Sequence, residues 1–139
     1  MSLYVLDTDT LSLWQHGHPA IGARVAACAP TDLAVSIITV QEQIDGWHSQ
    51  LTRAKERKRI ADLYRRLAET VRFLARLPIL VFTEAAIDRY DELRKLKLNI
   101  GKMDLRIAAI TLEHGAILVT RNARDFSRVP GLPIEDWTT

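Results

Sequence analysis

Four consecutive apolar residues open the chain at 3–6, and the acidic, hydroxyl-bearing segment Asp7-Thr8-Asp9-Thr10 follows at once. An apolar run without alternation predicts a strand buried on both faces, as in parallel sheets. The segment after it predicts a strand-to-helix turn in which Asp9 or Thr10 caps the next helix. Ligands of open α/β sheets bind beyond the carboxyl ends of the strands. The Asp7 carboxylate therefore belongs either to a turn or to a functional site.

Three more apolar runs, at 33–38, 79–82 and 116–120, are separated by stretches with helical spacing. A polar, basic segment at 50–59 predicts a loop or helix turn between two long helices. Buried strands that alternate with helices predict one α/β domain over residues 1–139. Its expected architecture is a three-layer α/β/α sandwich around a parallel sheet of four or five strands, the fifth an edge strand near Trp137.

Composition narrows the class of protein further. The 139 residues are 47% hydrophobic and 26% charged, which is ordinary for a soluble domain, and no apolar run approaches the length of a membrane span. Because the first strand begins so early, we expect no signal peptide. A single cysteine, Cys28, excludes an internal disulfide and a cysteine-based zinc site. We expect a cytoplasmic protein that does not associate with membranes.

The net charge of +2 is unevenly spread along the chain. Residues 53–76 contain nine Lys and Arg against three Asp and Glu, a local charge of +6, so the rest carries −4. A basic limb on an acidic body suits a polyanion that approaches an acidic site. The charge pattern alone favours the simpler interpretation, a solvated helix face.

Four carboxylates stand where such a sheet would gather them: Asp7, Glu42, Asp104 and Asp125. Taken singly, each is more typical of a cap or turn; Glu42 fits a capping box with Thr39, three residues earlier. Asp104 fits this interpretation least, because it precedes a nearly all-apolar helix and its carboxylate needs a partner. Crowded carboxylates repel one another unless a cation joins them, and Mg²⁺ or Mn²⁺ prefers such oxygen ligands. The four histidines show no ligand spacing.

On these residues the chain resembles the PIN-domain family, and within it the VapC-type toxins of toxin–antitoxin pairs. The resemblance is carried by Leu6-Asp7-Thr8-Asp9-Thr10-Leu11, by the segment 104–109, and by 119–126 continuing to 129–132 and Trp137. It implies that Asp7, Glu42, Asp104 and Asp125 bind the metal and that Asp9, Thr120 and Asn122 support the site. It also implies endonucleolytic cleavage of RNA, commonly tRNA or rRNA, dependent on Mg²⁺ or Mn²⁺. A homodimer silenced by a VapB-type antitoxin is the expected assembly.

Two other functions are compatible with parts of the sequence. A haloacid-dehalogenase-type phosphatase begins with Asp-x-Asp-x-Thr after a strand, but Leu11 stands at the fifth position here. A catalytically silent PIN-like module would bind RNA or a protein without cutting. The four carboxylates argue against the silent module, because crowding them is costly without a metal.

Several cationic and aromatic residues have two interpretations each. Lys102, Arg121 and Arg124 either position RNA phosphates or are solvated charges. Trp14, Trp47 and Trp137 are expected in the core; alternatively Trp14 or Trp47 lines a groove for an antitoxin helix. Tyr64 and Leu67 are candidates for dimer or antitoxin contacts.

Overall fold

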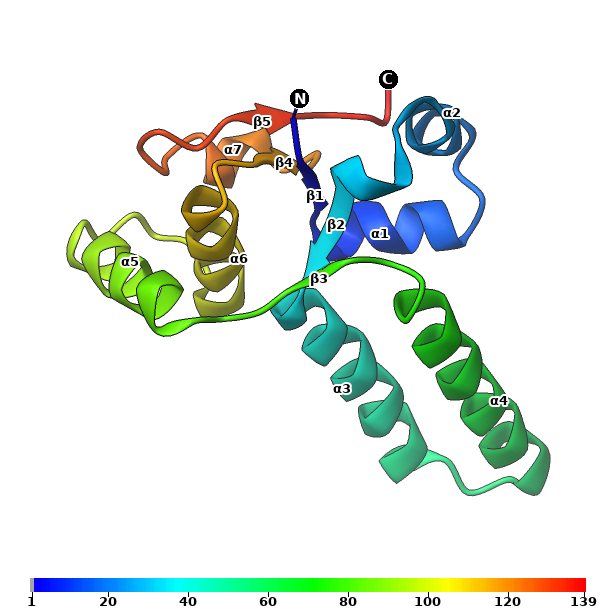
Figure 1. The fold of residues 1–139 in the computed structure, drawn as a ribbon. Coiled ribbons are helices and arrows are strands. Elements are labelled where there is room, and N and C mark those ends of the chain that lie inside the picture. The colour runs from blue at the N-terminus through cyan, green and yellow to red at the C-terminus, as the bar shows by residue number, and fades with distance from the viewer. Residues whose placement is uncertain (1) are drawn as a thin grey trace.

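The computed structural model describes residues 2–139, and strands and helices alternate through it as the sequence predicts (Figure 1). The strands are β1 (Tyr4–Leu6), β2 (Leu33–Ser36), β3 (Ile79–Leu80), β4 (Ile117–Val119) and β5 (Ile134–Glu135). The α-helices are α1 (Thr8–Gln15), α2 (Pro19–Ala27), α3 (Ile37–Arg53), α4 (Arg57–Leu74), α5 (Glu84–Lys95), α6 (Lys102–Glu113) and α7 (Ala123–Phe126). A 3₁₀ turn at Pro30–Asp32 precedes β2.

All five strands pair in parallel, in the order β3-β2-β1-β4-β5. The first strand therefore lies at the centre, where Val5 is level with Ala34 on one side and Leu118 on the other. This arrangement confirms the predicted parallel sheet and its fifth, edge strand.

Successive residues of β1 enter different halves of the core, because side chains alternate between the two faces of a strand. Val5 packs with apolar residues of α5 and α6, whereas Leu6 packs with Leu11 of α1, Ile21 of α2 and Leu74 of α4. Both faces are thus covered by helices, which explains the absence of polar alternation in the strands. The three-layer α/β/α sandwich is confirmed.

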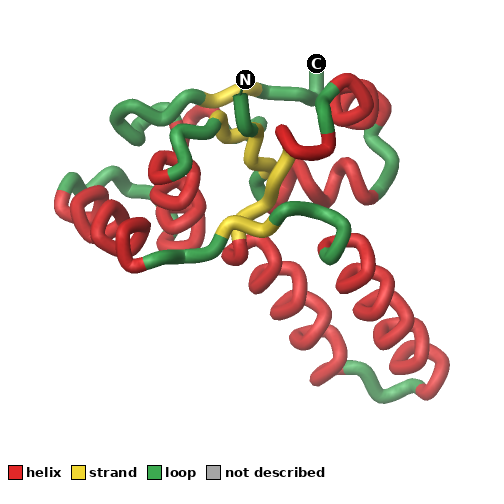
Figure 2. The backbone as a smooth tube through the Cα atoms, in the orientation of Figure 1, coloured by secondary structure: helices red, strands yellow, loops and turns green. Residues whose placement is uncertain are grey.

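A helical hairpin projects from the carboxyl edge of the sheet. Figures 1 and 2 show α3 and α4 lying side by side and extending away from the sheet and the other helices. We call this hairpin, residues 37–74, the arm. Helix α3 begins directly after β2, so the base of the arm adjoins the edge at which Asp7 follows β1.

Several predicted boundaries were wrong for local reasons. Asp7 itself caps α1, in place of Asp9 or Thr10. The second strand ends at Ser36, whose hydroxyl accepts a hydrogen bond from the Thr39 amide and starts α3 three residues before the predicted cap. The connection predicted at 50–59 between two long helices is present but shorter: only residues 54–56 lie outside α3 and α4, because the paired helices continue past the core into solvent. In the described part of the chain, no helix has the length and apolar character needed to cross a membrane.

Candidate active site

Asp7 is held at the end of the central strand by hydrogen bonds on both sides. Its amide donates to the Val119 carbonyl at 3.0 Å, and its Oδ1 accepts from the Thr10 amide at 2.8 Å. The residue is only 6% exposed. Burial raises the pKa of its carboxyl group, while the polar groups of Thr120 and Thr10 oppose the rise. Asp7 is therefore both a helix cap and a site carboxylate, two roles that the sequence presented as alternatives.

Glu42 lies on the second turn of α3, on the side that meets the start of α1. The Thr8 hydroxyl donates to Glu42 Oε1 at 2.7 Å and lies 3.0 Å from the Thr39 hydroxyl. The predicted capping box of Thr39 and Glu42 is wrong, because Ser36 caps α3. The carboxylate of Glu42 is thus turned toward the segment that follows β1 rather than toward its own helix terminus.

Asp104 lies in the first turn of α6, after the Gly101 cap. Among residues 2–139 its carboxylate has no hydrogen-bond partner, and a Cβ atom at Gly101 would lie 4.0 Å from its Oδ2. Burial raises the pKa of Asp104 to about 6, and the charges of Glu42, Asp7 and Asp125 add to the rise. The four predicted carboxylates therefore share one electrostatic environment.

Asp125 is placed by the short helix α7. Asn122 caps this helix: its Oδ1 accepts from the Asp125 amide at 3.3 Å, and its Nδ2 donates to Asp125 Oδ2 at 3.1 Å. The Thr120 hydroxyl accepts from the Asn122 amide at 3.0 Å. Arg128 Nη1 lies 3.6 Å from Asp125 Oδ1. Thr120 therefore holds Asn122, and Asn122 in turn holds the Asp125 carboxylate.

A cavity of about 570 Å³ opens between α1, α6 and the segment after β4. Asp7, Asp104 and Asn122 line it, and Thr8, Asp9, Ser12, Arg121 and Phe126 complete its wall. Asp9 and Arg121 form an ion pair there, with Nε to Oδ2 at 2.6 Å and Nη2 to Oδ1 at 3.4 Å. Asp9, predicted to support the carboxylates, therefore holds a guanidinium at the wall of the acidic cavity.

Metal binding can be judged from the donor set. In residues 2–139, no three His, Cys, Asp or Glu side chains stand close enough together to form a ready cation shell. The carboxylate oxygens nevertheless fit Mg²⁺ or Mn²⁺, which proteins often bind through one or two carboxylates and several waters. Asp7 and Asp104 both line the cavity, and within residues 2–139 Asp104 has no hydrogen-bond partner to displace. These two residues are the best placed ligands.

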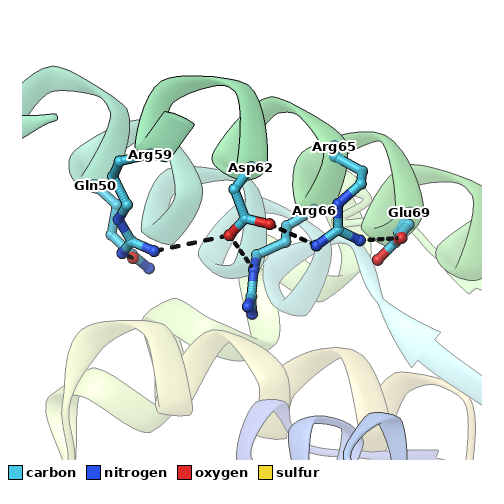
Figure 3. A network of polar contacts seen from close by, with 6 residues as sticks. All are labelled: Gln50, Arg59, Asp62, Arg65, Arg66 and Glu69. Carbon is cyan, nitrogen blue, oxygen red and sulfur yellow. Dashed lines mark hydrogen bonds and ion pairs between the residues drawn. The ribbon is translucent and has the colours of Figure 1, made fainter. Parts of the chain in front are cut away.

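The arm contains the basic limb that the sequence predicted. Figure 3 shows Arg59, Arg65 and Arg66 converging on Asp62, at 3.9, 2.6 and 2.8 Å respectively. Arg65 also pairs with Glu69. Within residues 2–139 no ion pair engages the cations at the tip of the arm, which are Arg53, Lys55, Arg57 and Lys58. With Glu56 included, residues 53–58 carry a net charge of +3, so the tip of the arm is cationic.

The sequence allowed two positions for the tryptophans, in the core or in a groove for a partner helix, and the three differ in burial. Trp137 is 2% exposed and packs on Tyr4, which confirms its core position. Trp14 and Trp47 are half-buried: Trp14 meets Phe73 edge-on, and Trp47 Nε1 donates to the Thr70 hydroxyl at 2.8 Å. Tyr64 is 59% exposed on α4. Sequence reasoning did not assign contacts to Thr8, which meets Glu42 of α3, or to Arg128, which meets both Asp125 and the Asn99 carbonyl.

The chain is an α/β protein with four acidic residues gathered at the carboxyl edge of its parallel sheet. The PIN domain family model matches residues 4–132. The chain is 32% identical to the tRNA(fMet)-specific endonuclease VapC of Salmonella typhimurium over 141 aligned positions, covering 99% of each protein. It is 30% identical to ribonuclease VapC1 of Haemophilus influenzae strain R2866, covering 98% of each. The chain therefore belongs to the PIN-domain family, and within it to the VapC proteins.

Solved structures agree with this assignment. The DNA-bound VapBC of Salmonella typhimurium superposes with a TM-score of 0.81 at 27% identity, covering 99% of both chains. VapBC-1 of nontypeable Haemophilus influenzae superposes with a TM-score of 0.77 at 29% identity, again over 99% of both. The likeness extends over the arm as well as the sheet, since almost the whole chain is covered.

Proposed function

We propose that this chain is the toxin of a toxin–antitoxin pair: an endoribonuclease that depends on Mg²⁺ or Mn²⁺ and cleaves tRNA or rRNA to stop translation. RNA cleavage is the activity in the names of its VapC relatives, one of which is specific for tRNA(fMet). The observation that carries the metal-dependent site is Asp104, whose pKa is raised to about 6 by burial and by three neighbouring carboxylates. Such crowding favours a bound divalent cation.

The protein fixes three of the four carboxylates through hydrogen bonds and leaves the fourth open. Asp7 is oriented by the Thr10 amide, Glu42 by the Thr8 hydroxyl and Asp125 by Asn122. Asp104 has no such partner among residues 2–139 and is the carboxylate most available to a cation. A divalent cation held by Asp7 and Asp104 would stabilise negative charge on the phosphate and lower the pKa of a water molecule. The carboxylates would orient that water toward the scissile phosphodiester.

Cationic groups account for the approach of RNA. Arg121 is tethered by Asp9 at the wall of the acidic cavity, so its guanidinium is available to a phosphate that enters there. Lys102 and Arg124 are exposed near the same edge. The tip of the arm adds sequence-independent attraction for the RNA backbone. Phosphate contacts of this kind position the substrate without specifying its sequence.

Cleavage of total cellular RNA by the purified chain tests the proposal. We expect discrete fragments in Mg²⁺ or Mn²⁺ and none in EDTA. The Asp104→Asn and Asp7→Asn proteins should lose at least a hundredfold in rate. The Asp88→Asn protein, which neutralises an exposed carboxylate on α5, serves as the matched control and should cleave normally. Equal cleavage by the Asp104→Asn and Asp88→Asn proteins would reject the acidic edge as the catalytic site.

The same assay separates the two other functions. Leu11, at the position where a haloacid-dehalogenase-type phosphatase has threonine, is fully buried in the core, so no hydroxyl is available there. Hydrolysis of small phosphoesters without RNA cleavage would favour that enzyme. RNA binding without cleavage under any metal condition would favour the silent module.

A VapB-type antitoxin is the partner that the VapBC complexes of the relatives support. The half-buried Trp14 and Trp47 lie where α1, α3 and α4 meet, and Tyr64 and Leu67 lie on α4. This surface suits an amphipathic antitoxin helix, because exposed aromatic side chains anchor such contacts. A homodimer in the cytoplasm completes the proposed assembly.

A further inference from the structure

We propose that a second pocket, at the start of helix α6, binds a backbone phosphate of the RNA that flanks the scissile one. This inference rests on the proposed function and names a subsite for its substrate. The pocket has a volume of about 450 Å³ and lies between the end of α5 and the start of α6. Four cations line it, namely Arg94, Lys97, Lys102 and Arg106, and no Asp or Glu does. We call it the cationic pocket.

Arg106 is fixed in this pocket by aromatic rings rather than by a carboxylate. Its guanidinium lies 5.6 Å from the ring centroid of Phe82 and 5.4 Å from that of Tyr90. Its Nε is buried without a hydrogen-bond partner, and its Nη1 has only the Met103 sulfur at 3.9 Å. Stacking orients the planar cation but leaves its charge unneutralised. Arg106 therefore adds a positive charge to the pocket that no carboxylate in residues 2–139 balances.

The other three cations are also poorly neutralised. Within residues 2–139 no ion pair engages Lys97 or Lys102, and Arg94 reaches Asp91 only at 3.8 Å. Like charges around one concavity repel one another, and an anion bound among them relieves the repulsion. The cationic pocket is positively charged, whereas the acidic cavity is lined by carboxylates. The cationic pocket therefore suits a phosphate rather than a metal ion.

The backbone at the pocket also favours an anion. Lys97 and Asn99 have φ angles of 51° and 59°, so the connection turns sharply before α6 begins. Gly101 caps this twelve-residue helix without a side-chain hydrogen bond, which leaves its first amides free of a protein cap. The positive end of the helix dipole adds to the field of the four cations.

The cationic pocket and the acidic cavity are joined through two residues. Lys102 lines the cationic pocket and Asp104 lines the acidic cavity, and both lie in the first turn of α6, where residues two apart point to different sides of the helix. Arg128 donates from Nη1 to the Asn99 carbonyl at 3.2 Å and lies 3.6 Å from Asp125 Oδ1. The two pockets thus meet at the first turn of α6, and the inference requires the RNA backbone to pass around this end of the helix. An RNA strand offers a regular series of phosphate anions, which an isolated acidic side chain of a protein does not.

RNA affinity in variants of the cationic pocket tests this inference. The probe is a single-stranded RNA oligonucleotide, measured in EDTA on the Asp7→Asn background so that no cleavage intervenes. The Lys97→Gln, Lys102→Gln protein removes two exposed cations of the pocket and spares the stacked Arg106. The control, Arg89→Gln, Lys95→Gln, removes equal charge from α5, where these residues pair with Glu113 and Glu92.

We expect the pocket variant to bind RNA several-fold more weakly. Its slope of log affinity against log salt should fall by about 0.7 for one lost phosphate contact. The control should keep the slope of the Asp7→Asn protein. A scan with one methylphosphonate linkage at a time should find a linkage whose neutralisation weakens the Asp7→Asn protein and not the pocket variant.

Equal slopes in the pocket and control variants would overturn the inference. Binding of inorganic phosphate that requires Lys97 and Lys102, with RNA affinity unchanged, would also overturn it and identify a free-phosphate site. If the pocket controls RNA affinity while the unmodified chain cleaves no RNA, the ribonuclease proposal fails and the subsite stands. If the unmodified chain cleaves RNA and the slopes are equal, only the subsite fails.

Discussion

At the scale of single residues, Asp104 combines partial burial, the absence of a hydrogen-bond partner among residues 2–139, and three neighbouring carboxylates. Its pKa of about 6 in the folded chain lies above the ordinary value of 3.8. The native state therefore holds this proton more tightly than the unfolded state does. For this group, stability is greatest below pH 4, falls as the pH rises toward 6, and stays reduced above 6.

Asp104→Asn should therefore stabilise the metal-free protein at neutral pH. In EDTA at pH 7.5 we expect a gain of roughly 1–2 kcal/mol in the free energy of unfolding, because one pKa unit is about 1.4 kcal/mol and solvent screens part of the shift. The gain should vanish at pH 4. Urea denaturation at both pH values measures it, with Asp88→Asn as control. A variant less stable than the parent at pH 7.5 would contradict the prediction.

The identity of the site residues was predictable, but their partners were not. Asp7 and Asp104 follow a strand and open a helix, and these positions are visible in the sequence. Glu42 meets Thr8 across 34 positions, and Arg121 meets Asp9 across 112. Such contacts depend on how α1, α3 and β4 pack, which local patterns do not contain. The ion pair of Asp9 is therefore a finding of the structure.

At the scale of elements, the arm places the cations that would attract RNA away from the carboxylates that would cleave it. Glu42 lies near the base of α3, and Arg53 lies eleven residues further along it, about 16 Å along the helix axis. Asp62 and Glu69 neutralise part of α4 but leave the tip cationic (Figure 3). Charge at the tip should therefore raise the rate of encounter with RNA without touching the scissile phosphate.

Arg57→Gln, Lys58→Gln should raise KM several-fold in low salt and leave kcat within about twofold. The expected effect shrinks above roughly 0.3 M salt, where screening shortens the reach of exposed charges. Initial cleavage rates at several salt concentrations measure it, beside the Arg89→Gln, Lys95→Gln protein. An unchanged KM would mean that the cations at the tip are only a solvated helix face, which is the simpler interpretation of the sequence pattern.

Element types were predictable more fully than element boundaries. Both Ser36 and Thr39 are suitable residue types to cap α3. Ser36 is the cap in the structure, because it ends the paired strand and its hydroxyl accepts a hydrogen bond from the Thr39 amide. The polar segment 50–59 was predicted as a loop or helix turn because it lacks a buried stripe. In the arm, helix pairing replaces core burial, and only residues 54–56 lie outside α3 and α4.

At the scale of the whole molecule, the parallel sheet followed from four unalternating apolar runs, whereas its order β3-β2-β1-β4-β5 required the structure. That order places β1 between β2 and β4 and thereby brings Asp7 between the segments that carry Glu42 and Asp125. The fold thus concentrates negative charge at one edge. A cation that binds only the folded edge must stabilise the entire domain.

Mn²⁺ should therefore raise the melting temperature of the chain. At a concentration one hundred times its Kd, the stabilisation is about 2.7 kcal/mol, or roughly 10 °C for a domain of this size. The shift should diminish from pH 7.5 to pH 5, because protons compete for Asp104 as the pH falls below its pKa of about 6. Thermal unfolding in Mn²⁺ and in EDTA measures it. Asp88→Asn should keep the shift and Asp104→Asn should lose most of it; equal shifts in the two variants would place the cation elsewhere.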